Sequence, residues 1–373
     1  ITEISLSEIH SFKNHPFKVM DDEKMDELVS SIRENGVLVP VLLRPDNHGG
    51  YGIEESWDSF LSGTAGKSIS LKDASQSEIA NSKQSYIAAE NGYDLTLTID
   101  ANIQDIVENQ LAKAVEEYQC ESGITIAMDP SSGKILAMAD YPSFDCNNKD
   151  TPNSRLAQTW DSLTSEEKNE SLFRMWTPKA VTNMYEPGSV FKIITSAIAI
   201  EENIMEPDIA GTFNCTGSYL VEGEKRPIKC HRYPKSHGLQ TLTQALGNSC
   251  NPAFIEMGQR LGIERFCYYF DAFGLRERTG IDLPAEVKGF NKTVDDMTNV
   301  DLASSAYGQC ATITPMEMVV SYCAAINGGY LLEPYVVDKV VDENGNVVMK
   351  NERTVKRQVV SEDTSQKMRE ALR

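Results

Sequence analysis

One helix pattern followed directly by two short apolar runs constrains the fold of this chain most. Residues 123–128 and 134–139 are apolar runs of strand length, joined by the turn sequence DPSSG. Residues 101–118 precede them and carry apolar side chains at helical spacing: Ile103, Ile106, Val107, Leu111, Ala114, Val115 and Tyr118. A long helix packed on an antiparallel hairpin opens a sheet covered by helices. The sequence therefore predicts an α/β (α+β) fold.

Length and charge exclude some classes of protein. A chain of 373 residues with 40% hydrophobic content can bury more than one core, since single cores stop growing near roughly 250–300 residues. The 35 basic and 55 acidic residues give a formal charge of -20, which repels phosphate backbones and anionic lipid surfaces. We therefore expect no nucleic acid partner. No apolar run reaches the ~18 residues of a membrane span, so no signal or transmembrane segment is expected in this chain.

The cysteines are spread thinly along the chain. None forms a C-x-x-C pair or a Cys/His cluster with the sequence spacing of a metal site, so we expect neither a metal nor a cofactor. Cys215 and Cys230 flank a polar loop that contains glycine, and they could form a disulfide in an oxidising compartment. Most of the eight are expected to be buried thiols: Cys120, Cys146, Cys215, Cys230, Cys250, Cys267, Cys310 and Cys323.

Ser189 and Lys192 form the strongest candidate pair for acyl transfer. They lie in EPGSVFK, where Pro187 and Gly188 predict a turn and Ser189 begins a helix. Lys192 then lies one turn later on the same face. The positive helix end and apolar surroundings lower the pKa of a lysine, which lets it act as a base near neutral pH. The apolar run 193–200 is expected to bury the pair and fix both rotamers.

Two other S-x-x-K sequences show how little the bare pattern means. Ser131 and Lys134 span the DPSSG turn, so they lack helical spacing, and we expect a plain turn. Ser165 and Lys168 lie in TSEEKNE, whose acidic residues keep a lysine protonated. We expect a solvated surface turn there. Residues 142–180 as a whole are polar and are expected to be an irregular loop region at the rim of the active site.

A second polar element follows in TLTQALGNSCNPAFIEMG, which holds Ser249, Cys250 and Asn251 between a short helix and Pro252. The Ser249 hydroxyl could relay protons, and the Asn251 amide could hold the lysine and the substrate backbone. A sequence such as NSCNP also occurs as a simple helix cap. The presence of Ser189 and Lys192 upstream favours the catalytic interpretation.

The order of EPGSVFK, NSCNPAF and AYGQCATITPMEM resembles class B penicillin-binding proteins of the cell-division and sporulation type. The likeness begins near residue 51 with GIEESWDSFLSGTAGK. It implies the fold shared by penicillin-binding transpeptidases and serine β-lactamases, with Ser189 acylated, Lys192 as its base, and Ser249 and Asn251 as the second catalytic element. It further implies peptidoglycan stem peptides as substrates, β-lactams as inhibitors, division or sporulation cell-wall machinery as partners, and an extracytoplasmic, membrane-associated location.

Two departures from that family are visible. Gly308-Gln309-Cys310 stands where the family has Gly-Gln-Gly, which is expected to narrow the backbone freedom of the turn slightly. No K-[ST]-G sequence occurs in these 373 residues. Arg278-Thr279-Gly280 is the nearest match, and it falls in a loop well upstream of the family position. Because losing oxyanion donors costs at least ~10²-fold in rate, we expect weak turnover from this chain.

Residues 1–51 resemble the start of ParB-like partition proteins, a family that binds nucleotide and centromeric DNA. They predict a strand at 4–6, a helix at 22–35 and a strand at 37–43. The family's arginine-rich phosphate box does not follow, and these residues hold 9 acidic against 5 basic side chains. The expected organisation is a ParB-like fragment at 1–51, a linker or pedestal remnant at 52–92 and a transpeptidase domain, lacking its last strands, at 93–373.

Three other functions stay open on the sequence alone. The chain could be an inactive penicillin-binding remnant with a binding or structural role, which a fluorescent penicillin would fail to label. It could be a ParB-like DNA or nucleotide binder, which nucleotide binding by residues 1–51 would support. It could also be a β-lactamase or serine peptidase, which rapid hydrolysis of the acyl-enzyme would reveal.

Overall fold

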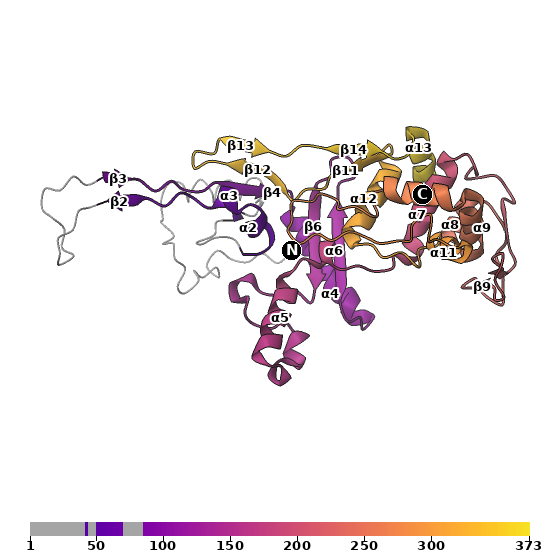
Figure 1. The fold of residues 1–373 in the computed structure, drawn as a ribbon, viewed down its shortest axis with the longest axis horizontal. Coiled ribbons are helices and arrows are strands. Elements are labelled where there is room, and N and C mark those ends of the chain that lie inside the picture. The colour runs from indigo at the N-terminus through magenta and orange to yellow at the C-terminus, as the bar shows by residue number, and fades with distance from the viewer. Residues whose placement is uncertain (1–41, 44–49, 70–84) are drawn as a thin grey trace, which may run out of the picture. The chain divides into compact units, whose positions relative to one another are not determined.

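The computed structural model describes residues 42–43, 50–69 and 85–373 (Figure 1). The chain divides into one unit at residues 1–39 and another at residues 40–373, and the described residues all belong to the second. The predicted strand at 4–6 and helix at 22–35 lie outside the described residues. Within the predicted strand at 37–43, Leu42–Leu43 forms strand β1.

The predicted helix and hairpin are confirmed. Helix α4 covers Ala101–Glu117, and β5 (Gly123–Met128) pairs antiparallel with β6 (Ile135–Tyr141). The Asp100 side chain caps α4 by accepting from the N–H groups of its first turn. The Gln104 amide of α4 donates to the carbonyl of Met138 at 3.0 Å and accepts from its N–H at 2.8 Å. These two hydrogen bonds fix the helix to β6, the strand against which it packs.

The sheet with the most strands in the described part of the chain is antiparallel, with the strand order β1-β4-β12-β13. Its members beside β1 are β4 (Asp94–Leu97), β12 (Val337–Val341) and β13 (Val347–Lys350). The other pairs are β2 (Lys67–Ile69) with β3 (Ser85–Ile87), β7 (Phe213–Cys215) with β10 (Gly238–Gln240), β8 (Ser218–Tyr219) with β9 (Ile228–Lys229), and β11 (Tyr330–Leu332) with β14 (Val355–Gln358). Antiparallel strands accompanied by helices confirm the predicted fold class.

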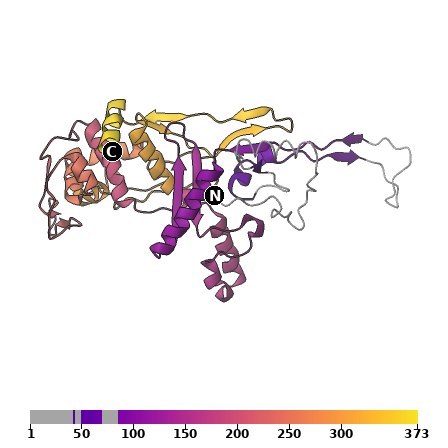
Figure 2. The same cartoon turned by 180° about the vertical axis from the view of Figure 1, so that it is seen from behind.

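Helix α7 lies at the centre of the helical core. It runs over Lys192–Glu201, and every residue from 192 to 200 is buried, as a helix that is apolar on all sides requires. Figures 1 and 2 show the helices gathered around it. Its neighbours are α8 (Leu242–Gly247), α9 (Asn251–Leu261), α12 (Pro315–Ile326) and α13 (Glu362–Ala371). Helices α10 (Ile263–Ala272) and α11 (Asn299–Ser305) pack on α9.

The prediction of an irregular loop at 142–180 is wrong. This region contains the helices α5 (Ser165–Trp176) and α6 (Lys179–Thr182), with short 3-10 turns at Cys146–Asn148, Leu156–Gln158 and Trp160–Ser162. Helix α5 begins at a capping box in which Thr164 and Glu167 bind each other's backbone N–H groups. Leu172 and Met175 give it a buried side, which the polar composition conceals.

Two short helices lie near the start of the described chain. Helix α2 covers Gly52–Ser56 and α3 covers Asp58–Leu61. Trp57, which lies between the two helices, and Leu61, the last residue of α3, are buried in the main hydrophobic core. Among the described residues, no helix combines the length and the apolar character needed to cross a membrane.

Candidate active site

Ser189 and Lys192 meet at the start of the central helix. Ser189 lies in a 3-10 turn, η5 (Gly188–Phe191), that continues into α7 at Lys192. The Lys192 Nζ lies 3.2 Å from the Ser189 Oγ. Lys192 is 1% exposed, whereas Ser189 is exposed. The expected burial of both residues therefore holds for the lysine alone, and the hydroxyl stays open to a substrate.

The loop between α8 and α9 brings Ser249 and Asn251 to the same lysine. The Lys192 Nζ lies 2.8 Å from the Ser249 Oγ, 2.9 Å from the Ser249 carbonyl oxygen and 2.8 Å from the Asn251 Oδ1. The Ser249 hydroxyl also donates to the Ser189 Oγ at 3.0 Å. Cys250, not Ser249 or Asn251, is the N-cap residue of α9, and no side chain caps it. The helix-cap alternative is therefore wrong, and all four predicted site residues lie together.

Burial lowers the pKa of Lys192 to about 8, while the nearby Cys250 and Cys230 thiols act in the opposite direction. A neutral lysine amine has two hydrogens and one lone pair. The Ser249 carbonyl oxygen and the Asn251 Oδ1 can only accept hydrogen bonds, so the two hydrogens of the amine point toward them. The lone pair then faces the serine hydroxyls, which is the arrangement a base needs to take a proton from Ser189.

The turn that carries Ser189 is held against a second backbone segment. The Gly188 N–H donates to the Gly308 carbonyl oxygen at 2.8 Å, and a Cβ on Gly308 would overlap the Gly188 oxygen. Cys310 has φ of 66°, and its N–H donates to the Glu186 Oε1 at 2.9 Å. Cys310 thus takes the left-handed conformation that glycine adopts without strain. The departure from Gly-Gln-Gly therefore falls where a side chain is costly.

Neither of the other S-x-x-K sequences forms a comparable site. Ser131 binds Asp129 within the hairpin turn, and Lys134 forms an ion pair with Asp338 at 2.7 Å, as expected for a plain turn. Ser165 is the first residue of α5, so the expected surface turn is a helix start instead. The Lys168 Nζ lies 5.2 Å from the centroid of the Trp160 ring, so this amine makes a cation–π contact.

Arg278-Thr279-Gly280, the nearest match to K-[ST]-G, does not form part of the site either. Thr279 is buried, and its N–H donates to the Glu286 Oε1 at 2.7 Å, with a further bond from its hydroxyl to the same oxygen. The Gly280 N–H binds the other oxygen at 3.1 Å. The threonine and glycine are therefore used to hold a loop together.

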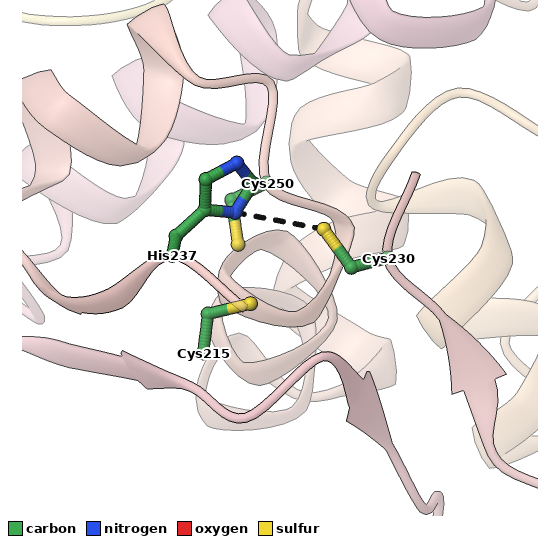
Figure 3. A group of neighbouring side chains, drawn as sticks. All are labelled: Cys215, Cys230, His237 and Cys250. Carbon is green, nitrogen blue, oxygen red and sulfur yellow. Dashed lines mark hydrogen bonds between the residues drawn. The ribbon is translucent and has the colours of Figure 1, made fainter. Parts of the chain in front are cut away.

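A cluster of cysteines and one histidine beside the site escaped the sequence analysis. Cys215, Cys230, His237 and Cys250 place their ligand atoms within 4.8 Å of one another (Figure 3). Spacing along the sequence did not reveal this cluster, because paired strands and a helix start bring separated residues together. Cys215 and Cys230 are free thiols. The sequence feature that could have indicated this cluster is Cys250, between Ser249 and Asn251, together with the two cysteines upstream of it.

The thiols of this cluster are in unequal surroundings. Burial raises the pKa of Cys250 to about 12. Burial also acts to raise the pKa of Cys215, but backbone hydrogen bonds from His237 and Gly217 and further sulfur contacts outweigh it, and the net shift is downward. Burial and the neighbouring His231 lower the pKa of His237. Cys215 is thus the more acidic of these two thiols.

Comparison with known proteins agrees with this geometry. Residues 123–373 match the penicillin binding protein transpeptidase domain, and residues 1–54 match the ParB N-terminal domain. Stage V sporulation protein D of Bacillus subtilis is 34% identical over 328 residues, which cover 88% of this chain and 47% of the relative. The peptidoglycan D,D-transpeptidase FtsI of Buchnera aphidicola is 29% identical over 79% of this chain and 47% of its own length.

Solved structures agree as well. Penicillin binding protein 3 from Mycobacterium tuberculosis in its apo form has a TM-score of 0.69 at 27% identity, covering 88% of this chain and 64% of its own. The same protein complexed with ampicillin has a TM-score of 0.68 at 26% identity, covering 88% and 63%. The chain spans about half the length of the curated relatives it matches. The predicted resemblances are confirmed, and the chain belongs to the penicillin-binding protein transpeptidase family.

Proposed function

We propose that this chain is a peptidoglycan D,D-transpeptidase-type domain in which Ser189 is acylated by the D-Ala-D-Ala end of a stem peptide. The observation that carries the proposal is the set of contacts around one buried amine. The Lys192 Nζ lies within hydrogen-bond distance of the Ser189 Oγ, at 3.2 Å, and is oriented by two acceptors, the Ser249 carbonyl and the Asn251 Oδ1. A nucleophile, a base and the groups that orient the base are the minimum set for acyl transfer.

The acylation step follows from these positions. The Ser189 Oγ attacks the carbonyl carbon of the penultimate D-Ala while its proton passes to the lone pair of Lys192. The tetrahedral intermediate then collapses, the C–N bond breaks, and the leaving D-Ala nitrogen takes a proton. The Ser249 hydroxyl, 2.8 Å from the Lys192 Nζ and 3.0 Å from the Ser189 Oγ, lies where it can pass that proton from the lysine.

The second half-reaction uses the same groups in reverse. The amine of another stem peptide attacks the acyl-enzyme carbonyl and loses its proton through Ser249 to Lys192. The ester C–O bond then breaks, and Lys192 returns a proton to the Ser189 Oγ, 3.2 Å away. A β-lactam would enter by the same attack, because opening its ring also breaks a C–N bond and forms an ester with Ser189. The exposed Ser189 above a buried Lys192 gives either substrate access to the nucleophile while water is kept from the base.

The names of relatives support this assignment. FtsI of Buchnera aphidicola is named a peptidoglycan D,D-transpeptidase, and penicillin binding protein 3 of Mycobacterium tuberculosis has been solved with ampicillin and with aztreonam. We extend the proposal to an extracytoplasmic, membrane-associated site of action and to partners in division or sporulation cell-wall synthesis. Residues 93–373 would form the catalytic domain, with 52–92 as the pedestal remnant and 1–51 as the ParB-like fragment.

Labelling with a fluorescent penicillin tests the proposal. The wild-type chain should form a covalent adduct that survives denaturation, and Ser189→Ala should form none. Ser131→Ala and Ser165→Ala are matched controls, because each removes the serine of another S-x-x-K sequence. Both should label as the wild type does. A folded wild-type chain that stays unlabelled would favour a binding role, and an adduct that hydrolyses within seconds would favour a β-lactamase.

A further inference from the structure

Four potential metal ligands converge beside the acylation site from separate elements (Figure 3). Cys215 ends strand β7, Cys230 directly follows β9, His237 directly precedes β10, and Cys250 directly precedes α9. Cys215, Cys230 and Cys250 are 1%, 3% and 0% exposed. Three buried cysteines with one histidine form the donor set that structural zinc sites use.

The spacing of these atoms fits a tetrahedral ion. The four ligand atoms lie within 4.8 Å of one another, and the Cys230 Sγ lies 3.6 Å from the His237 Nδ1. With Zn–S near 2.3 Å and Zn–N near 2.0–2.1 Å, the S–N edge of a tetrahedron is about 3.6 Å. The cluster thus needs only a small contraction to enclose one ion.

The backbone around the cluster is already organised to hold thiolates. The backbone N–H groups of His237 and Gly217 face the Cys215 sulfur and act to lower its pKa, which favours the thiolate. The Cys230 N–H donates to the Gly217 carbonyl at 2.9 Å, which ties two of the ligand-bearing segments together. Strands β7 and β10 pair directly and bring Cys215 opposite Gly238, next to His237. Such N–H donors orient metal-bound thiolates and compensate their charge.

We propose that Cys215, Cys230, His237 and Cys250 bind one Zn²⁺ in a closed, four-coordinate structural site that anchors the Ser249–Asn251 segment. Binding releases the protons of the three thiols to solvent and leaves three thiolates and one neutral imidazole on the ion. No position remains for water or substrate, so the ion acts by holding structure and takes no part in acyl transfer.

Cys250 connects the proposed zinc site to the segment that binds Lys192. It is the residue between Ser249 and Asn251, and both of those bind the Lys192 amine at 2.8 Å. Ser249 has φ of 48°, so the loop is held in a left-handed conformation that a serine alone does not favour. An ion bound to the Cys250 sulfur would hold this turn. This part of the inference rests on the proposed function of Ser189 and Lys192.

Metal analysis of the whole chain tests the site without reference to catalysis. The wild-type protein, reduced and then dialysed against Zn²⁺, should retain about one ion per chain and should have three thiols protected from a thiol reagent. Cobalt substitution should give the absorption of a tetrahedral thiolate complex. Cys230→Ser and His237→Ala should lower zinc affinity by more than about 100-fold. If these variants fail to fold, the wild-type stoichiometry and cobalt spectrum decide the question.

Matched controls lie close by. His231→Ala removes an exposed histidine whose Nδ1 is 3.9 Å from the Cys230 Sγ, and Cys323→Ser removes a buried thiol outside the cluster. Both should bind zinc as the wild type does. Sub-stoichiometric zinc in the reduced wild type, a disulfide among the three cysteines of the isolated protein, or unchanged affinity in His237→Ala would each overturn the site.

Penicillin labelling separates this inference from the proposed function. Removing zinc with a chelator should slow acylation of Ser189 by at least about tenfold, and adding zinc back should restore it, because the ion holds residues that orient the base. Zinc binding without any labelling would overturn the proposed function and leave the metal site standing. Equal labelling with and without bound zinc would overturn the anchoring role.

Discussion

The Oδ1 of Asn251 lies 2.8 Å from the Nζ of Lys192, although the two residues are 59 positions apart in the sequence. This oxygen cannot donate a hydrogen bond, so it fixes where one hydrogen of the amine points. Together with the Ser249 carbonyl it turns the lysine lone pair toward the serine hydroxyls. The geometry of this one amine therefore decides whether Lys192 can act as a base toward Ser189.

Asn251→Ala should slow acylation of Ser189 by about 10- to 100-fold, because a hydrogen bond to a charged or reacting group contributes about 1.5–3 kcal/mol. The matched control is Asn248→Ala, in the same loop, whose amide donates to the Gln240 Oε1 at 2.9 Å and does not touch the lysine. Second-order rate constants for penicillin acylation measure the effect. Equal rate losses in the two variants would show that Asn251 acts only through the loop.

The rate of acylation should rise with pH until about pH 8 and then level off. The pKa of Lys192 is lowered by burial to about 8, and the amine accepts a proton only in its neutral form. Below that pKa the neutral fraction falls tenfold for each pH unit. Asn251→Asp places a negative charge beside the amine, which raises the pKa of a lysine, so the profile should move to higher pH. A flat profile would rule out Lys192 as the base.

Gly308→Ala should destabilise the protein and slow acylation, because a Cβ there overlaps the Gly188 carbonyl oxygen in the turn before Ser189. Gly345→Ala is the matched control, since Gly345 also has a positive φ, of 79°, but has no atom within 4 Å of an added Cβ. Both variants incur the cost of placing a side chain at a positive φ, which is about 1–2 kcal/mol. Gly308→Ala should lose about 1–3 kcal/mol more. Urea unfolding of the two variants measures the difference.

Glu317 should make stability fall as pH rises toward neutrality. Burial raises the pKa of this carboxyl from 4.5 to about 7, although N–H donors from Thr314 and Gly289 act to lower it. A carboxyl whose pKa is higher in the folded state contributes stability that is complete below about pH 4.5 and lost as pH rises through about 7. Relative to Glu317→Gln, the wild-type free energy of unfolding should drop by about 2 to 3 kcal/mol between pH 5 and 7.5. A constant difference over that range would contradict the assignment.

The fold was predictable where sequence patterns are local. Helix α4, the β5–β6 hairpin and the buried helix α7 each follow from apolar periodicity within one short segment. Helix α5 was missed because its buried side is narrow, with Leu172 and Met175 among many polar residues, although the Thr164 to Glu167 capping box was visible. Polar composition alone does not distinguish a half-exposed helix from a loop.

The site was predictable for a different reason. Ser189 and Lys192 are neighbours on one helical turn, and Ser249 and Asn251 could be added by their resemblance to a family motif. The cluster around Cys250 was not predictable from spacing, because its members come from paired strands and a helix start. Their convergence depends on tertiary pairing, which no local sequence pattern records.

Identification of the acylated residue tests the central claim most directly. The reduced wild-type chain would be incubated with a penicillin, digested, and its peptides sequenced by mass spectrometry. We predict a single adduct with the mass of one penicillin molecule, on Ser189 and on neither Ser131 nor Ser165 of the other S-x-x-K sequences. An adduct on another residue, or a folded chain that forms no adduct, would contradict the account.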